Sequence, residues 1–184
     1  MVPAVRVIAG TYKGRRLKAP SWEGLRPTSD KLRETLFNVL APRTAGARVL
    51  DGYAGTGAIG IEAASRGAAH VTFVERDRRA QALIEENLAH CGVPADGFVI
   101  IRASVSRALG DLHAAPFDIM IFDPPYDDEI DTVIAAAGQH LAPGGVVVLE
   151  HARRRATAER AGILQRTREL ISGDSALTFY AMTP

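Results

Sequence analysis

The stretch "DPPY" at residues 123–126 ends a predicted buried strand, and its side chains are suited to holding a planar amine. Proline has no N–H to give a sheet, so two consecutive prolines end a strand abruptly and stiffen the loop that follows. The Asp123 carboxylate and the Pro124 carbonyl can each accept one N–H bond, which fixes the amine and stabilises positive charge as it attacks. The ring of Tyr126 offers a face for a base to stack on. The alternative is a rigid loop with an incidental tyrosine.

A second candidate site is the glycine-rich stretch "LDGYAGTGAIG" at residues 50–60. Gly55, Gly57 and Gly60 have G-x-G-x-x-G spacing between a predicted strand and a predicted helix, where glycines let the backbone turn tightly and a ligand approach closely. Glu75, about twenty residues further on, ends the next predicted strand and can accept both hydroxyls of a ribose. Loop and acid together predict a cofactor that contains adenosine. The alternative is a plain tight turn.

The glycine motif alone does not separate NAD from S-adenosylmethionine. Asp51 stands directly before the loop, where its charge would repel the pyrophosphate of a dinucleotide but attract an ammonium or a sulfonium group. The sequence also shows no second nucleotide-binding half and no substrate domain of a dehydrogenase. Both features favour S-adenosylmethionine.

Strands and helices alternate from residue 48 onward and must position these two sites. Short apolar strands alternating with helices predict an α/β fold with a doubly wound, Rossmann-like parallel sheet. Two further strands around a Gly173-Asp174 turn predict a C-terminal antiparallel hairpin. The expected strands cover residues 48–51, 70–75, 98–103, 117–123, 144–150, 162–170 and 175–182.

The N-terminal part has a different pattern. Residues 6–20 begin with β-branched residues and contain two glycines, which predicts a small β-hairpin or an extended arm. Residues 28–40 predict a helix whose N-cap is one of residues 28–30, and Pro42 is expected to end it. We therefore expect an N-terminal hairpin and helix extension over residues 1–47 and a catalytic domain over residues 48–184.

Composition is that of an ordinary globular protein, with 184 residues, 47% hydrophobic and 23% charged. No stretch approaches the roughly 20 apolar residues of a membrane span, and the N-terminus lacks the apolar region of a signal peptide. The single cysteine, Cys91, excludes an internal disulfide and a multi-cysteine zinc site. We expect a cytoplasmic monomer without a metal.

The net charge of +1 hides an uneven distribution. The first 48 residues carry ten Lys and Arg against three Asp and Glu, whereas the remainder carries twelve against eighteen. Such segregation suggests a basic arm for an anionic partner on an acidic body. The alternative is that the basic residues only solvate one face.

Four stretches resemble a known family. "DPPY" with the glycine loop resembles amino-methyltransferases that modify exocyclic amines of DNA or RNA bases. Within these, the whole chain resembles the RsmD family of bacterial 16S rRNA guanine-N2 methyltransferases, and "RPTSDKLRETLFNVL" is the most specific stretch, since general methyltransferases lack it. The matching stretches are residues 6–17, 26–40, 50–68 and 173–180.

This resemblance implies transfer of a methyl group from S-adenosylmethionine to N2 of one guanine, on assembled or nearly assembled 30S subunits. It implies that Asp123, Pro124 and Tyr126 hold the guanine. Ser104 stands where the family often has Asp or Asn facing the adenine. The expected cofactor-binding residues are Asp51, Tyr53, Gly55, Gly57, Glu75, Arg76, Ser104 and Asp123.

Basic residues of the N-terminal part are the expected contacts to small-subunit rRNA phosphate. For Arg33 an internal ion pair with Glu34 is the alternative. The target guanine would have to leave its stack to reach Asp123. The expected RNA-binding residues are Arg6, Lys13, Arg15, Arg16, Lys18, Arg26, Lys31 and Arg33.

Three other functions compete with this interpretation. A DNA amino-methyltransferase acting on adenine N6 or cytosine N4 would also use "DPPY", but the sequence shows no target-recognition domain. An NAD-dependent oxidoreductase would explain the glycine loop and Glu75 but not "DPPY". A non-catalytic RNA-binding factor would need neither motif.

Overall fold

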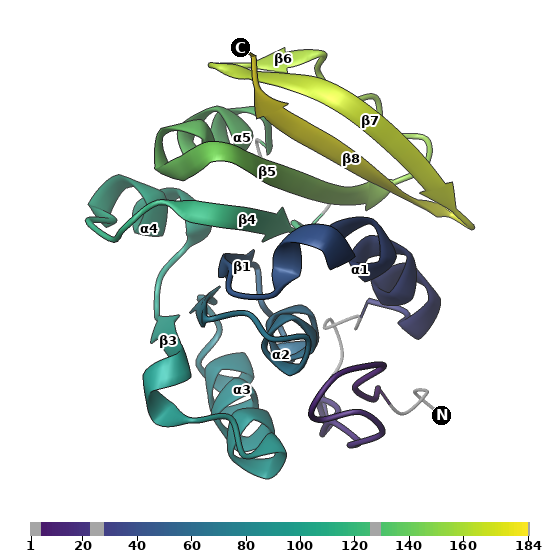
Figure 1. Ribbon diagram of the computed structural model, residues 1–184, viewed down its shortest axis with the longest axis vertical. Helices are drawn as coiled ribbons and strands as arrows, with labels where there is room; N and C mark the ends of the chain where they lie inside the picture. The colour runs from purple at the N-terminus through teal and green to yellow at the C-terminus, as the bar shows by residue number, and fades with distance from the viewer. Residues whose placement is uncertain (1–4, 23–27, 126–129, 184) are drawn as a thin grey trace.

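The computed structural model describes residues 5–22, 28–125 and 130–183, which contain one mixed sheet of eight strands in the order β3-β2-β1-β4-β5-β8-β7-β6 (Figure 1). Strands β1 to β5 are parallel, and β8, β7 and β6 continue the sheet antiparallel. The predicted doubly wound sheet with a C-terminal antiparallel hairpin is confirmed. The strands are β1 Arg48–Gly52, β2 His70–Val74, β3 Phe98–Ile101, β4 Phe117–Phe122, β5 Leu141–Ala152, β6 Arg160–Ala161, β7 Leu164–Ser172 and β8 Ser175–Met182.

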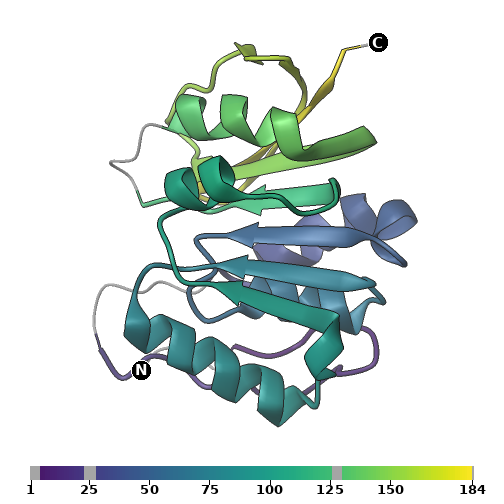
Figure 2. The same ribbon diagram turned by 90° about the vertical axis from the view of Figure 1, so that its left-hand side faces the viewer.

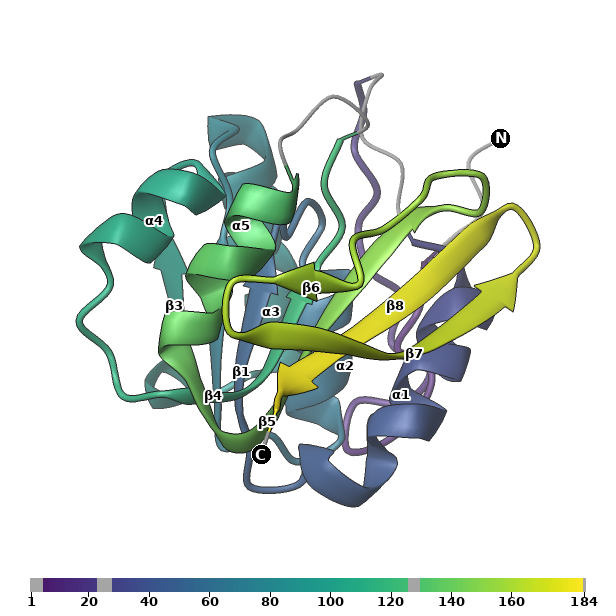
Figure 3. The same cartoon turned by 90° about the horizontal axis from the view of Figure 1, so that it is seen from above.

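Helices cover both faces of this sheet, with α1 and α2 on one side and α4 and α5 on the other (Figures 1 and 3). Side chains alternate along β4, so Ile119 and Ile121 join one hydrophobic cluster and Met120 and Phe122 join the other. No helix in the described ranges is long and apolar enough to cross a membrane. The helices are α1 Asp30–Thr44, α2 Ala58–Ser65, α3 Arg78–Cys91, α4 Val105–Asp111 and α5 Ile130–Ala137, with short 3-10 helices η1 Ala95–Gly97 and η2 Gly138–His140.

The N-terminal hairpin is reduced to a single β-bridge between Arg6 and Arg16. Two hydrogen bonds flank this bridge, from the Leu17 N–H to the Val5 carbonyl at 2.8 Å and from the Val7 N–H to the Arg15 carbonyl at 2.9 Å. The buried side chains of Val5, Val7 and Leu17 belong to the same hydrophobic cluster as α1 and α2. This segment therefore packs directly on the sheet domain, and the boundary between residues 47 and 48 stays a prediction.

Helix α1 begins one residue after its N-cap, Ser29, whose side chain accepts from the Leu32 N–H at 3.2 Å. The prediction that Pro42 ends this helix is wrong, because the helix continues to Thr44. Proline removes one N–H, and here the carbonyl left without that donor belongs to Asn38, an exposed residue whose carbonyl can bind water. A proline in the last turn is therefore tolerated.

A buried carboxylate, that of Glu62 on α2, holds the N-terminal segment in place. It accepts hydrogen bonds from the backbone N–H groups of Ile8 at 2.7 Å and Ala9 at 3.1 Å. It also accepts from Nε of Arg66 at 2.7 Å and lies 3.8 Å from Nη1 of Arg33. Glu62 and Arg33 are both fully buried. One acid thus links the N-terminal segment, α1 and α2.

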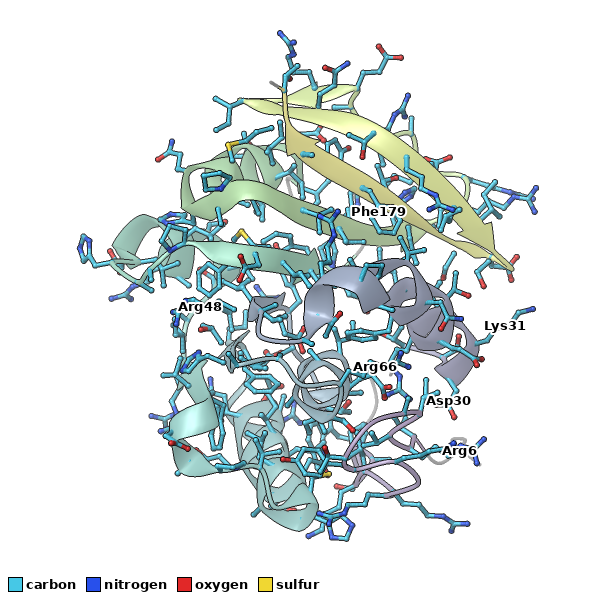
Figure 4. All side chains as sticks on the ribbon, in the orientation of Figure 1. Arg6, Asp30, Lys31, Arg48, Arg66 and Phe179 are labelled. Carbon is cyan, nitrogen blue, oxygen red and sulfur yellow. The ribbon has the colours of Figure 1, made fainter. Side chains whose placement is uncertain are left out.

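Arg33 also binds two groups nearer the surface, the Asp30 carboxylate at 2.6 Å and the Arg6 carbonyl at 2.8 Å. Figure 4 shows Arg6, Asp30 and Arg66 on the side of the molecule where these elements meet. The prediction that Arg33 contacts RNA is wrong, since a side chain with no exposed surface cannot reach a phosphate. It forms an internal ion pair as the alternative supposed, but with Asp30 and Glu62 in place of Glu34.

We expect Glu62→Leu to destabilise the protein by about 3–5 kcal/mol, because it leaves the buried cation of Arg33 without its acid. Urea unfolding followed by circular dichroism measures the change. The matched control is Glu85→Leu, which removes a half-exposed partner of Arg102 and should cost at most about 1 kcal/mol. Equal losses in the two variants would contradict this role of Glu62.

Candidate active site at the carboxyl ends of the strands

The carboxyl ends of β1, β2 and β4 meet at one edge of the sheet, where their arrowheads point in the same direction in Figure 2. Gly52 of β1 is in register with Val74 of β2 and with Phe122 of β4. The next residues therefore lie side by side, namely the glycine loop (residues 53–57), Glu75 and Asp123. The structure brings the two predicted sites together in the place where ligands bind in open α/β sheets.

Left-handed backbone conformations shape the glycine loop. Gly55 and Gly57 have φ of 56° and 77°, and Tyr53 has φ of 62°, which is uncommon for a residue with a side chain. Gly57 is the N-cap of α2. Gly60, inside α2, has a different role: a Cβ there would lie 2.2 Å from the ring of Phe73 on β2. The third glycine thus allows close packing of the helix on the sheet.

Glu75 is fixed in place before any ligand arrives. Its Oε2 accepts from the Gly55 N–H at 2.9 Å and its Oε1 from the Asp77 N–H at 2.8 Å. Its own carbonyl accepts from the Gln81 side chain at 2.7 Å. Each carboxylate oxygen keeps a lone pair free of these backbone donors, so the group can accept hydroxyls beside the loop. This geometry fits a ribose.

Asp51 is buried at the end of β1 and accepts from the Gly60 N–H at 2.8 Å. Burial raises its pKa well above the usual range, the bond from Gly60 opposes this, and the nearby charges of Asp123 and Glu75 add to the rise. Three neighbouring carboxyl groups favour a bound cation, which relieves their repulsion. The residues present therefore fit a cofactor with positive groups and disfavour a pyrophosphate.

Asp123 and Pro124 follow β4, and both are half-buried. The Thr28 hydroxyl donates to Oδ2 of Asp123 at 3.2 Å, which leaves Oδ1 for another donor. Burial raises the pKa of Asp123 to about 6, and the hydrogen bond from Thr28 opposes this rise. Tyr126, the third predicted catalytic residue, lies outside the described residues.

Glu150 is a further acid at this edge that the sequence analysis did not identify. Leu149 of β5 is in register with Phe122 of β4, so the residues that come next, Glu150 and Asp123, lie side by side. Burial raises the pKa of Glu150 to about 8, and the charge of Asp123 contributes. The available signal was its position, because it directly follows an apolar run of residues, as Glu75 and Asp123 do.

The remaining cofactor predictions stay untested. Ser104 is exposed and caps α4 by accepting from the Arg107 N–H at 3.4 Å. Arg76 is exposed next to Glu75. The ring of Tyr53 contacts Phe122 edge to face, with centroids 6.5 Å apart. No group of three or more potential metal ligands occurs in the described part of the chain.

The residues predicted to contact RNA differ in whether they already bind other groups of the protein. Arg6 pairs with Asp30 at 3.4 Å and Lys18 with Glu86 at 3.0 Å, both at the surface. Arg15 donates to the Cys91 carbonyl and lies over the ring of Tyr12. Arg26 lies outside the described residues. The other three predicted contacts, which are exposed, are Lys13, Arg16 and Lys31.

We expect Glu150→Gln to change how stability depends on pH. Between the ordinary glutamate pKa of 4.5 and about 8, the folded protein holds a proton that the unfolded chain has lost, so the stability of the wild type falls as pH rises. The variant should be more stable than the wild type at pH 8, with a smaller difference at pH 5. Urea midpoints at both values test this.

The control for this experiment is Glu34→Gln, which alters an exposed acid on α1. Its midpoint should follow that of the wild type at both pH values. If the urea midpoint of Glu150→Gln also changes between pH 5 and pH 8 by the same amount as that of the wild type, Glu150 does not keep a proton in the folded state.

Comparisons of the sequence and of the structure with known proteins point to the same family. Residues 5–181 match the model of the family described as "Conserved hypothetical protein 95". The chain is 36% identical over 184 residues to "Putative rRNA methyltransferase YlbH" of Bacillus subtilis, an alignment that covers 96% of this chain and 98% of that protein.

A curated relative and a solved structure, both from Escherichia coli, are also similar. "Ribosomal RNA small subunit methyltransferase D" is 41% identical over 122 residues, which are 66% of this chain and 60% of that protein. The solved structure titled "Putative methyltransferase yhhF from Escherichia coli" superposes with a TM-score of 0.85 at 30% identity and covers 97% of this chain and 98% of that one. The chain therefore belongs to the family described as "Conserved hypothetical protein 95", the RsmD family, whose relatives above are named methyltransferases.

Proposed function

We propose that this methyltransferase modifies the N2 amine of one guanine in small-subunit rRNA, on assembled or nearly assembled 30S subunits. The observation that supports this most is the position of Asp123 and Pro124, directly beside the glycine loop and Glu75. An amine acceptor and a cofactor site thus share one edge of the sheet. The names of the Bacillus subtilis and Escherichia coli relatives specify rRNA, and the latter specifies the small subunit.

Five of the proposed cofactor residues form the site itself. Glu75 would accept the ribose hydroxyls, because backbone N–H groups already aim its carboxylate at the loop. Asp51 and the loop residues Tyr53, Gly55 and Gly57 would surround the methionine end. S-adenosylmethionine supplies an electrophilic methyl group on a cationic sulfur, and the surrounding acids favour that charge.

The acceptor amine would be held by two oxygens. An exocyclic amine of guanine is a poor nucleophile, since its lone pair is delocalised into the ring. Oδ1 of Asp123 and the Pro124 carbonyl would each accept one N–H, which directs the nitrogen and stabilises its developing positive charge. The ionised carboxylate is the form that accepts, so activity should fall as pH drops through the pKa of Asp123, about 6.

Exposed cations on the N-terminal segment would bind rRNA phosphate. Lys13 lies in the turn that precedes Arg16, Arg16 is a member of the Arg6–Arg16 bridge, and Lys31 lies in the first turn of α1. Because the proposed substrate is a bacterial ribosomal particle, the proposed location is the cytoplasm. A monomer is the proposed state.

We expect Asp123→Asn to lower kcat by roughly 10²–10³-fold, because a neutral amide stabilises the developing charge less well than a carboxylate. The assay uses 30S subunits from cells without this gene, followed by digestion of the rRNA and mass analysis of its nucleosides. Calorimetric titration with S-adenosylhomocysteine should give a Kd within a few-fold of the wild type. Asp96→Asn, at an exposed acid of η1, is the matched control.

This experiment also separates the rival functions. The wild type should yield N2-methylguanosine. Methylated adenine or cytosine would refute the proposed acceptor. A protein that binds NAD and does not bind S-adenosylhomocysteine would refute the proposed cofactor. Near wild-type turnover by Asp123→Asn would refute the proposed mechanism.

We expect the double variant Lys13→Glu/Arg16→Glu to raise KM for 30S subunits at least roughly tenfold and to reduce its dependence on salt, with little change in kcat. The control is Arg160→Glu/Arg168→Glu, which makes the same charge change at exposed positions of β6 and β7. Steady-state assays at several salt concentrations measure both. If KM and its salt dependence stay at wild-type values, the N-terminal segment does not bind the substrate.

A further inference from the structure

We propose that Thr28 is a positioning residue for the methyl-acceptor site: its hydroxyl holds the Asp123 carboxylate in the orientation that receives the amine. The N-terminal extension would then complete the catalytic site in addition to contacting RNA. This inference rests on the proposed function, in which Asp123 binds the acceptor amine.

The contact joins residues 95 positions apart in the chain. Thr28 donates to Oδ2 of Asp123 at 3.2 Å, and both residues are half-buried. The terminal torsion of an aspartate is broad and nearly two-fold, so a carboxylate without a partner has no fixed orientation. One hydrogen bond to Oδ2 selects an orientation and leaves Oδ1 for the substrate. Thr28 thereby reduces the reorganisation that binding of the amine would require.

Thr28 is available for this contact because its neighbour caps the helix. Threonine and serine hydroxyls at a helix start usually accept from the first turn. Here Ser29 has that role, with its Oγ 3.2 Å from the Leu32 N–H. The hydroxyl of Thr28 is therefore not needed for capping. The two adjacent hydroxyls can be separated experimentally, since one stabilises α1 and the other contacts Asp123.

The start of α1 is held firmly, which gives the hydroxyl a defined position. Leu32 and Leu36 are buried in the hydrophobic cluster beneath the helix. Arg33 binds Asp30, Glu62 and the Arg6 carbonyl from within the first turn. Thr28 directly precedes Ser29, the N-cap of this turn. Packing of the N-terminal segment therefore extends as a continuous set of contacts to the catalytic carboxylate.

The electrostatic surroundings explain why a neutral donor is useful there. Three other acids stand at the ends of the neighbouring strands, namely Asp51 on β1, Glu75 after β2 and Glu150 on β5, and the charge of Asp123 raises the pKa of both Asp51 and Glu150. Each disfavours a second negative charge, and burial disfavours it further. The Thr28 hydroxyl donates its single proton to Asp123 and lowers the pKa of that carboxyl. A lysine in its place would stabilise the carboxylate but would also compete with the cationic cofactor.

The test compares Thr28→Val, which keeps the shape without the hydroxyl, with Thr28→Ser, which keeps the hydroxyl. We expect Thr28→Val to lower kcat on 30S subunits roughly tenfold, the effect of losing one hydrogen bond to a charged group. The Kd for S-adenosylhomocysteine should not change. The acid limb of the pH–rate profile should move to higher pH, because the pKa of Asp123 rises without its donor. Thr28→Ser should restore most of both properties.

Ser29→Ala is the control for a merely structural effect. It removes the cap of α1 and should lower the urea midpoint while leaving the acid limb unchanged. The inference is overturned if Thr28→Val keeps wild-type kcat and pH profile. It is also overturned if the kcat loss appears without a shift of the acid limb, as a purely structural role would give.

A measurement without substrate separates this inference from the proposed function. Carbon-13 spectra of aspartate-labelled protein follow the titration of the Asp123 carboxyl, which titrates together with Glu150. The midpoint should be higher in Thr28→Val than in the wild type and restored in Thr28→Ser. An unchanged midpoint refutes the positioning role, whatever the nucleoside analysis gives. A shifted midpoint with a different methylated base refutes the acceptor and leaves the role of Thr28 standing.

Discussion

The interaction on which the rest of the structure depends is the buried ion pair of Glu62 and Arg33. Glu62 accepts hydrogen bonds from two backbone N–H groups of the N-terminal segment, and its ion pair with Arg33 connects these contacts to α1. Two buried charges are tolerated because Glu62 accepts three hydrogen bonds and Arg33 donates through Nη2 to Asp30 and to the Arg6 carbonyl. Either charge without the other would be costly. Without this pair, neither the segment nor the start of α1 would have a fixed place on α2, and the hydroxyl that reaches Asp123 would lose its support.

A second constraint is the crowding of acids where the parallel strands end. The pKa values of Asp51, Asp123 and Glu150 are all raised, chiefly because these groups are buried, and the charge of Asp123 adds to the rise for Asp51 and Glu150. Such an arrangement is unfavourable for an empty protein and favourable for one that binds a cation. Functional sites commonly retain charges that stability alone would remove. The acids thus explain both why the proposed cofactor is a sulfonium and why stability is expected to fall at high pH.

Much of this could be predicted from the sequence, because local patterns determine it. Apolar strands alternating with helices gave the parallel sheet, and glycine spacing placed the loop between β1 and α2. The failures involve contacts between distant residues. The burial of Arg33 depends on Glu62, 29 positions away, and the Thr28 contact depends on Asp123. Glu150 belongs to no sequence motif, and its place in the site follows only from the pairing of β5 with β4. Pro42 inside α1 shows that position within a helix outweighs residue type.

The close packing of Gly60 on Phe73 has a consequence for the cofactor site as a whole. The same glycine donates its N–H to Asp51. One residue therefore sets both the distance between α2 and the sheet and the orientation of the Asp51 carboxylate. Any side chain at position 60 would act as a wedge between helix and sheet. It would lift the start of α2, and with it the loop, away from β1. The position of the glycine loop above the strands is therefore set by the absence of a single carbon atom on the face of α2 that packs against the sheet.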